Sequence, residues 1–267
     1  MTAVTSWSPS RLDKYKECPL KFRLVVLEKL CGSCFAGKIR GGYDKPAVCD
    51  SCGNVEEIAA PLARGSVLDA NATKYIMGES ATLNPEVKRH PKVHDLLKDL
   101  RASRKKKVVQ ILTQKQICLT ETWEATEPTP WNKKAWFRGA LDCLVINGTS
   151  ARVYDWKSGG IDKNTGNVRG DQKYDDQIFA YNVAVLCAYP QVEVVQSALV
   201  FFDCGPRFEP IISRPELDLK RDDLEKAKKT WGSKLKAYFS DKSFSPKPGH
   251  YCGWCPYAKK KGGPCKF

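Results

Sequence analysis

The chain has 267 residues, of which 42% are hydrophobic, and its 44 lysines and arginines against 30 aspartates and glutamates give a net charge of +14. This composition excludes a disordered chain, and the absence of an apolar run of about 18 residues excludes a membrane-spanning helix. The charge favours a polyanionic partner such as nucleic acid over a membrane surface, although a basic surface without such a partner explains it equally well.

The first predicted element is a helix that begins after Ser8, which can cap it, with Pro9 in its first turn. Its apolar stripe continues to Val26, with a bend or restart at Pro19. The first ten residues lack the pattern of a signal peptide, so we expect a cytoplasmic protein, or one in the host-cell cytoplasm if it is viral.

The later elements predict an α/β core, with a small mixed sheet and helices on its faces. In chain order we expect a glycine- and cysteine-rich insert over 31–54, helices over 62–78 and on to about 104, strand within 107–125, a β-hairpin over 135–157, a polar loop over 159–172, a helix over 175–188, a buried strand over 192–202 and an amphipathic helix over 216–239.

The hairpin carries Asp142, Asp155 and Lys157. Asp155 and Lys157 share one face of their strand because side chains alternate. With Asn147-Gly148 as the two turn residues, Asp142 lies diagonal to Asp155 on that face, with Cα atoms roughly 7–8 Å apart. Carboxylates at this separation can bind one Mg²⁺ or Mn²⁺ ion. Ordinary charges on an exposed edge are the alternative, but the apolar flanking residues favour a functional site.

Gln177 and Tyr181 are four residues apart on the predicted helix that follows the hairpin, so they share one helical face. Both side chains can hydrogen-bond a phosphate or a water molecule. A polar stripe on a surface helix is the alternative reading of this pair.

Twelve cysteines in a cytoplasmic chain indicate metal ligands before disulfides. Two Cys-x-x-Cys pairs predict a zinc site formed by Cys31, Cys34, Cys49 and Cys52. Lys38, Arg40 and Lys45 in its loop are candidates for DNA contact, and a purely structural clip is the alternative. Four isolated cysteines are expected to pack in the core, namely Cys118, Cys143, Cys187 and Cys204.

An ordered set of motifs resembles the RecB-like branch of the PD-(D/E)XK nucleases, which includes CRISPR-associated and AddB-type enzymes with an iron–sulfur cluster. The matching residues cover nearly the whole chain: Ser8-Pro9-Ser10-Arg11-Leu12 with Tyr15 and Cys18-Pro19; Gly139-Ala140-Leu141-Asp142; Asp155-Trp156-Lys157-Ser158-Gly159; Gln177 with Tyr181; and Cys252-Gly253-Trp254-Cys255-Pro256 through Cys265. The resemblance implies one nuclease domain over 1–267 with a restriction-endonuclease-like core, a mixed central sheet flanked by helices. It also implies an iron–sulfur segment over 246–267 that closes onto Cys18, whereas the four-cysteine zinc module over 31–54 is an insert indicated by its own cysteine spacing.

The resemblance also implies roles for the site residues. Asp142 and Asp155 would hold Mg²⁺ or Mn²⁺, and Lys157 would position or deprotonate the attacking water and offset charge in the transition state. Gln177 and Tyr181 would steady the DNA backbone or the nucleophile.

One motif departs from the family, which usually has a histidine in an early Gly-x-x-x-His helix. Here Gly65 is followed four residues later by Asp69, which we take as a substitute metal ligand. His90 and His94 are poorer alternatives, both expected on the surface, and a helical aspartate without a role is the remaining one.

The family's cluster ligands correspond to Cys18, Cys252, Cys255 and Cys265, which suit a [4Fe–4S] cluster that ties the two ends of the chain together. Zinc is the main competitor at these thiolates, and Cys265 follows Cys255 at a longer spacing than the family has.

The expected activity is Mg²⁺- or Mn²⁺-dependent DNA hydrolysis, most simply by an exonuclease acting on single strands or free ends in recombination, repair or replication. An endonuclease or flap nuclease on the same fold is one alternative. A non-catalytic, zinc-containing nucleic-acid-binding module is the other.

Overall fold

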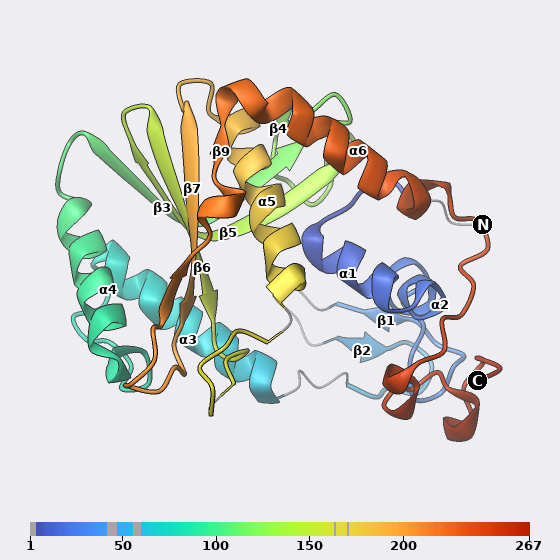
Figure 1. Cartoon of the computed structure of the whole chain (residues 1–267). Coiled ribbons are helices and arrows are strands. Elements are labelled where there is room, and N and C mark those ends of the chain that lie inside the picture. The colour runs from blue at the N-terminus through green and yellow to red at the C-terminus, as the bar shows by residue number, and fades with distance from the viewer. Residues whose placement is uncertain (1–3, 42–46, 56–59, 163, 170) are drawn as a thin grey trace. The chain divides into compact units, whose positions relative to one another are not determined.

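The computed structural model describes residues 4–41, 47–55, 60–162, 164–169 and 171–267 (Figure 1). By their internal contacts the described residues divide into two compact units, Met1–Ile58 with Gly232–Phe267 and Ala59–Trp231. Among the described residues, no helix is both long enough and apolar enough to cross a membrane.

The unit Ala59–Trp231 is built on a mixed sheet that has seven strands in the described part of the chain. The strand order is β4-β3-β5-β6-β7-β8, and β9 pairs with β7. Only the β6–β7 pairing is parallel among these, and α5 (Asp171–Ala188) connects those two strands. The strands are β3 (Val109–Leu119), β4 (Ala125–Thr126), β5 (Phe137–Asn147), β6 (Ser150–Lys157), β7 (Val194–Phe201), β8 (Ile211–Ser213) and β9 (Leu219–Lys220).

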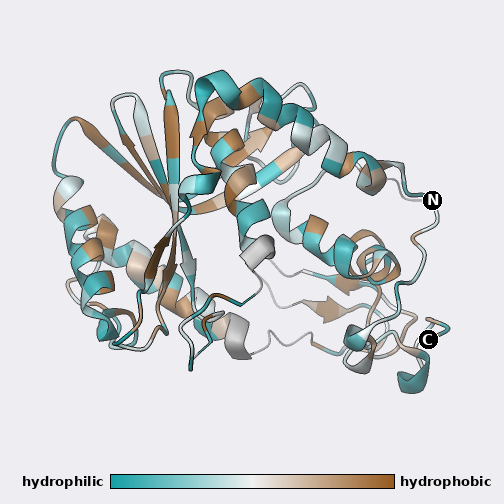
Figure 2. Ribbon diagram, in the orientation of Figure 1, coloured by the Kyte–Doolittle hydropathy of each residue, from teal (hydrophilic) through white to brown (hydrophobic). Residues whose placement is uncertain are grey.

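Helices cover both faces of this sheet, because alternate residues of its strands are apolar on both sides. Helices α3 (Ala60–Met77) and α4 (Pro91–Ser103), with the 3-10 turn Val87–Arg89 between them, pack against one face, where Val200 lies. Leu199 and Phe201 of the same strand face Ile178 of α5. Figure 2 shows the apolar colouring of β7 and the mixture of apolar and polar residues along α3, α4 and α5. The predicted mixed sheet with helices on its faces is therefore confirmed.

The other unit contains both ends of the chain. It begins with α1 (Pro9–Glu17), α2 (Pro19–Phe22) and a π-helical turn over Arg23–Leu27, and Ser8 Oγ accepts the backbone N–H of Arg11 at 3.3 Å. The cap and the restart at Pro19 are as predicted. The remaining elements are β1 (Ile39–Arg40), its antiparallel partner β2 (Val48–Cys49), the end of α6 (Leu224–Ser240), and the 3-10 turns His250–Gly253 and Lys259–Lys261.

The last long helix was predicted to begin at residue 216, but α6 begins at Leu224. The residues before it form 3-10 turns over Pro215–Leu217 and Arg221–Asp223, with β9 between them. Leu219 is buried and pairs with Val195 of β7, so pairing with the sheet overrides the local helical pattern.

Candidate functional site

The hairpin of β5 and β6 has a different register from the predicted one. Asn147 still pairs with Ser150, so Gly148 and Thr149 are the two turn residues. Gly148 has a φ of 59°, and a glycine at the first position of a two-residue turn is the type II′ pattern. The shift of the turn by one residue places Asp142 across from Asp155 instead of diagonal to it.

The two strands separate where these acids lie. The paired part of β5 and β6 ends at Cys143 and Tyr154, although both strands continue. Beyond this point the Asp142 carboxylate accepts the backbone N–H of Trp156 at 2.7 Å. A side chain therefore takes the place of a backbone acceptor, and Asp142 is held in the opening between the strands.

Asp155, Lys157, Gln177 and Tyr181 form one hydrogen-bonded network. Asp155 is 2% exposed and pairs with the Lys157 ammonium, which also donates to Gln177 Oε1 at 3.1 Å. Gln177 Nε2 donates to Asp155 at 3.0 Å and to the Tyr181 hydroxyl at 3.1 Å. The predicted shared face of Gln177 and Tyr181 is confirmed, and it points at the hairpin acids. Burial raises the pKa of Tyr181, which keeps its hydroxyl protonated.

Helix α3 brings a third carboxylate to the site. Asp69 lines one cavity with Asp142, together with Gly65, Ser66, Trp156, Ser158 and Phe202. Both carboxylate oxygens of Asp69 accept from Gln114 Nε2, at 2.9 and 2.7 Å. The sequence did not indicate Gln114, because its contact with Asp69 joins residues 45 positions apart.

The surroundings of the three carboxylates disfavour their charged forms. Burial, and then the negative charges of Asp155 and Asp69, raise the pKa of Asp142 well above its ordinary range. Burial also raises the pKa of Asp155, although the ammonium of Lys157 opposes the shift. Burial and the charge of Asp155 raise the pKa of Asp69 to about 6. Three acids beside one lysine form an oxygen-rich set that fits a divalent cation such as Mg²⁺ or Mn²⁺.

Of these acids, Asp69 and Asp142 line the cavity, whereas Asp155 is buried in the network with Lys157 and Gln177. Among the described residues, the carboxylate oxygens of Asp69, Asp142 and Asp155 do not form a group within 4.8 Å of one another. The structure thus brings Asp69 and Asp142 to one cavity and places Asp155 across from Asp142 on the neighbouring strand.

The two alternative histidines are not at this site. His90 was expected on the surface, but it is only 4% exposed, with Nε2 3.0 Å from the Phe208 carbonyl and Nδ1 accepting the Lys92 N–H at 3.3 Å. The prediction was wrong because His90 caps α4 and is covered by the segment that contains Phe208. Both of its ring nitrogens are already engaged in the fold.

A second candidate site lies in the unit that holds both chain ends. The sulfurs of Cys31, Cys34, Cys49 and Cys52 all lie within 4.8 Å of one another. Cys31 and Cys52 are 3.9 Å apart and Cys34 and Cys49 are 3.6 Å apart. Four thiolates at the Zn–S length of about 2.3 Å in a tetrahedron would be about 3.8 Å apart. The predicted quartet therefore has the size of a zinc site.

Backbone N–H groups point at these sulfurs. Ser33, Gly37 and Ser51 each donate to a cysteine Sγ at 3.4 Å. The N–H of Gly37 is the largest of the causes that lower the pKa of Cys34 to about 6. Such bonds stabilise the thiolate form that binds metal.

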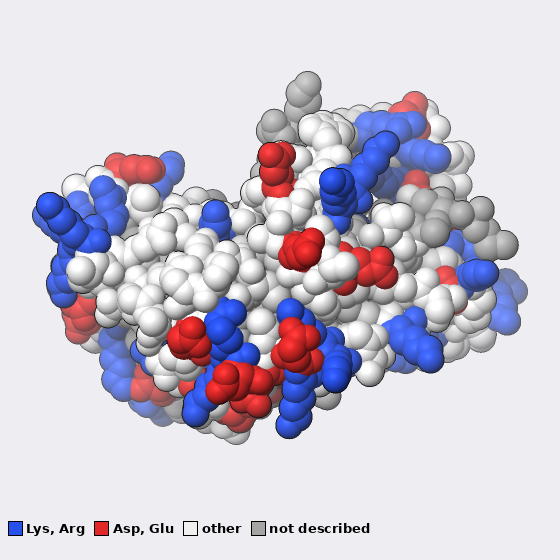
Figure 3. Space-filling model, turned by 90° about the horizontal axis from the view of Figure 1, so that it is seen from above, with Lys and Arg blue, Asp and Glu red and all other residues white. Residues whose placement is uncertain are grey.

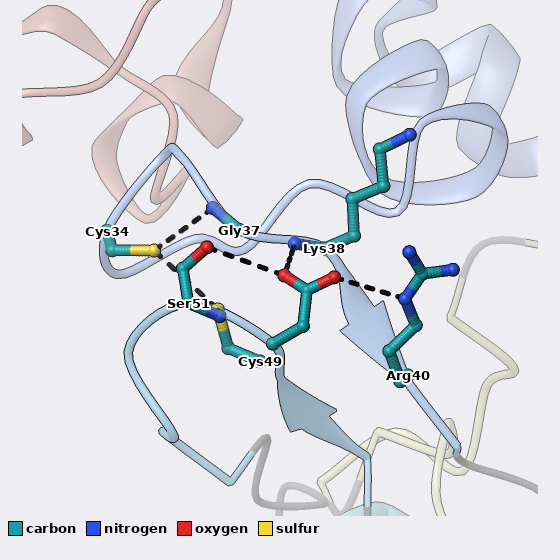
Figure 4. Close-up of polar contacts among 7 residues, drawn as sticks. Cys34, Gly37, Lys38, Arg40, Cys49 and Ser51 are labelled. Carbon is teal, nitrogen blue, oxygen red and sulfur yellow. Dashed lines mark hydrogen bonds and ion pairs between the residues drawn. The ribbon is translucent and has the colours of Figure 1, made fainter.

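Gly37 and Asp50 shape the loop around the sulfurs (Figure 4). A Cβ atom on Gly37 would lie 2.4 Å from Cys49 Sγ, so only glycine fits there. The Asp50 carboxylate accepts the Lys38 backbone N–H at 2.7 Å and Arg40 Nε at 3.1 Å. Figure 4 shows the Lys38 side chain directed away from the sulfurs, whereas Lys45 lies outside the described residues.

The third site is a cavity lined by all four predicted iron–sulfur ligands, Cys18, Cys252, Cys255 and Cys265. Despite its long spacing from Cys255, Cys265 reaches this cavity because the chain turns back after Tyr257, whose carbonyl accepts the Cys265 N–H at 3.0 Å. Gly263 allows this return, since a Cβ atom there would lie 2.3 Å from the Tyr257 backbone. Among the described residues these four sulfurs do not form a group within 4.8 Å of one another, unlike those of Cys31, Cys34, Cys49 and Cys52.

The two cysteine sites are joined by Tyr257, whose hydroxyl donates to the Leu30 carbonyl at 2.6 Å.

The isolated cysteines behave as predicted, since Cys118, Cys143 and Cys204 are buried and Cys187 is half-buried. Lysine and arginine side chains are scattered over the face seen in Figure 3, with acids between them.

Comparison with known proteins identifies the family of the chain. The family model described as the PD-(D/E)XK nuclease superfamily matches residues 6–259. A solved structure titled "Crystal structure of SSO0001" is similar over 73% of this chain and 78% of its own, with 12% identity and a TM-score of 0.29. No curated protein matches the chain.

Proposed function

Because the chain belongs to the PD-(D/E)XK nuclease superfamily, we propose that it is a Mg²⁺- or Mn²⁺-dependent deoxyribonuclease of the RecB-like branch. The observation that carries this proposal is the meeting of Asp142, Asp155 and Lys157 where β5 and β6 separate. If no cation bound here, two buried carboxylates would have too little positive charge beside them, which is costly for a hairpin with only a structural role.

Asp142 and Asp155, with Asp69 across the cavity, would hold the divalent ion. When bound, this ion supplies an activated water and stabilises the charge that develops on the phosphate. The chain's own residues orient the reactants. Lys157 is held between Asp155 and Gln177 Oε1, so its ammonium is already positioned to attract a phosphate oxygen or the attacking water.

Gln177 fixes this arrangement, since its amide oxygen accepts from Lys157 while its amide nitrogen donates to Asp155. The Tyr181 hydroxyl accepts from the same nitrogen, which leaves its own proton free for a phosphate or a water molecule. Both residues are therefore proposed to steady the DNA backbone or the nucleophile.

We propose exonucleolytic action on single-stranded DNA or free ends, in recombination, repair or replication, with protein partners from those processes. The test is cleavage of end-labelled linear single-stranded DNA by anaerobically purified protein with Mg²⁺, Mn²⁺ or EDTA. We expect metal-dependent loss from one end, and Lys157→Ala should be slower by about a hundredfold. Lys98→Ala, at an exposed surface pair on α4, is the matched control.

A circular single-stranded substrate separates the alternatives, because a strict exonuclease spares it. Cleavage of circles at the rate of linear DNA would favour the endonuclease alternative on the same fold. Binding without cleavage under every divalent metal would leave the non-catalytic module.

We also propose that Cys31, Cys34, Cys49 and Cys52 bind zinc. The 3.6 and 3.9 Å sulfur distances support a single tetrahedral ion there. For the cavity lined by Cys18, Cys252, Cys255 and Cys265 we propose a [4Fe–4S] cluster, supported by the four cysteines that line it.

Anaerobically purified protein is expected to contain about four irons and four acid-labile sulfides per chain. Cys18→Ser and Cys265→Ser should each lose most of this iron, whereas all four zinc ligands remain in both variants. Cys187→Ser, which changes a half-buried cysteine outside both sites, should keep both metals. Full iron content in Cys265→Ser would show that Cys265 is not a ligand of the cluster.

A further inference from the structure

Gln114 has a backbone conformation that side-chain-bearing residues rarely adopt. Its φ is 51°, in the left-handed region, although it lies in the middle of β3. Pairing with β5 continues on both sides of it, through Thr113 with Cys143 and Lys115 with Leu141. The irregularity is therefore confined to the position across from Asp142.

The Gln114 side chain is directed at the third carboxylate of the site. Its Nε2 donates to both oxygens of Asp69, at 2.9 and 2.7 Å. Asp69 belongs to α3 and lines the same cavity as Asp142. A neutral amide that donates to both oxygens fixes the direction of a carboxylate while leaving its negative charge in place.

A contact that only held α3 against β3 would not require the left-handed backbone conformation of Gln114. Pairs between a helix and a strand form readily from unstrained residues, whereas a left-handed glutamine costs free energy. Local irregularities of strands near active sites redirect a side chain. Here the redirected side chain meets Asp69, the acid that shares a cavity with Asp142.

We propose that Gln114 is a positioning residue of the metal site, which holds Asp69 in the direction needed for it to act as the third carboxylate ligand. This inference rests on the proposed metal-dependent nuclease. Gln114 acts through Asp69, and its contribution is the fixed orientation of that carboxylate toward the cavity shared with Asp142.

The test measures Mn²⁺ affinity on the full chain, by electron paramagnetic resonance of free Mn²⁺, independently of cleavage. Gln114→Gly removes the amide and relieves the left-handed strain. We expect its Mn²⁺ affinity to fall by about tenfold or more, while its metal-free melting temperature stays unchanged or rises. Gln116→Gly makes the same substitution at an exposed position two residues along β3, and should keep wild-type affinity.

A double-mutant cycle assigns the effect to Asp69. In an Asp69→Ala background, Gln114→Gly should cause no further loss of Mn²⁺ affinity. Mn²⁺ affinity within about twofold of wild type in Gln114→Gly alone would overturn the inference. An equal loss of Mn²⁺ affinity on Gln114→Gly in the wild-type and Asp69→Ala backgrounds would also overturn it.

The two proposals fail in different ways. Wild-type protein that binds Mn²⁺ through Asp142 but cleaves no DNA would refute the nuclease, while the affinities would still judge Gln114. Wild-type protein that binds no Mn²⁺ would overturn both. Cleavage that persists with unchanged Mn²⁺ affinity in Gln114→Gly would overturn only the positioning role.

Discussion

Without divalent metal, the Asp142→Asn protein is expected to unfold at a higher temperature than the wild type, and with metal to cleave DNA about a thousandfold more slowly. The amide oxygen of the introduced asparagine would still accept the Trp156 N–H, so the opening between β5 and β6 is preserved. What the substitution removes is one of three crowded negative charges, and with it a proposed metal ligand.

The pH dependence of stability follows from the same charges. The folded-state pKa of Asp142 is raised by burial and by Asp155, and that of Asp69 is raised to about 6. Between the ordinary aspartate pKa of about 3.9 and these raised values, the folded protein binds more protons than the unfolded chain. Metal-free stability therefore falls as pH rises through this window, and it should fall less steeply in Asp142→Asn.

Melting temperatures across this pH range, with and without Mn²⁺, measure the effect. Mn²⁺ should stabilise the wild type because it binds the folded state, and should stabilise Asp142→Asn much less. Asp162→Asn is the matched control. Backbone N–H donation from Asn164, followed by the hydrogen bond from Arg169, lowers the pKa of Asp162 to about 2, so that control should not gain stability. A metal-free Asp142→Asn protein less stable than wild type would mean that Asp142 serves the fold rather than a cation.

Much of this site was predictable because its signals are local. Alternation along a strand placed Asp155 and Lys157 on one face, and four-residue spacing on a helix placed Gln177 beside Tyr181. The turn was not settled by the sequence, since Asn147-Gly148 and Gly148-Thr149 both suit a two-residue connection. Pairing of β5 with β3 and of β6 with β7 fixes the strands on both sides, and so selects the second register.

The features that escaped prediction depend on distant contacts. Alternation cannot reveal that the Asp142 carboxylate replaces a backbone acceptor where two strands part. The left-handed backbone of Gln114 and the burial of His90 under the segment of Phe208 likewise depend on the tertiary fold. Cys265 was doubtful by spacing alone, because the return of the tail depends on the close backbone approach at Gly263.

The second large effect is expected from loss of the zinc site. The segment from Cys31 to Val55 has strands of two residues each, and most of its described side chains are exposed or half-buried. So small a core cannot offset the conformational entropy of its chain. Zinc bound to four thiolates contributes on the order of 10 kcal/mol, which makes metal binding and local folding one event.

Gly37→Ala tests this coupling while all four thiols remain. Its Cβ would lie 2.4 Å from Cys49 Sγ and 2.6 Å from Ser51, so the loop cannot close around the ion. We expect Gly37→Ala, like Cys49→Ser, to lose most of its zinc and the hydrogen-exchange protection of residues 31–41 and 47–55. Gly53→Ala is a matched control for the loss of a glycine, since nothing lies within 4 Å of the added Cβ, although its φ of 70° brings some strain.

The unit Ala59–Trp231 has its own buried core, so its exchange protection should survive in both zinc-site variants. Iron retention should fall with zinc, because Tyr257 holds the Leu30 carbonyl with its hydroxyl and the Cys265 N–H with its backbone. Unchanged protection of residues 31–41 and 47–55 in zinc-free protein would contradict the coupling. Normal iron content in that protein would show that the tail closes on Cys18 without help from the zinc loop.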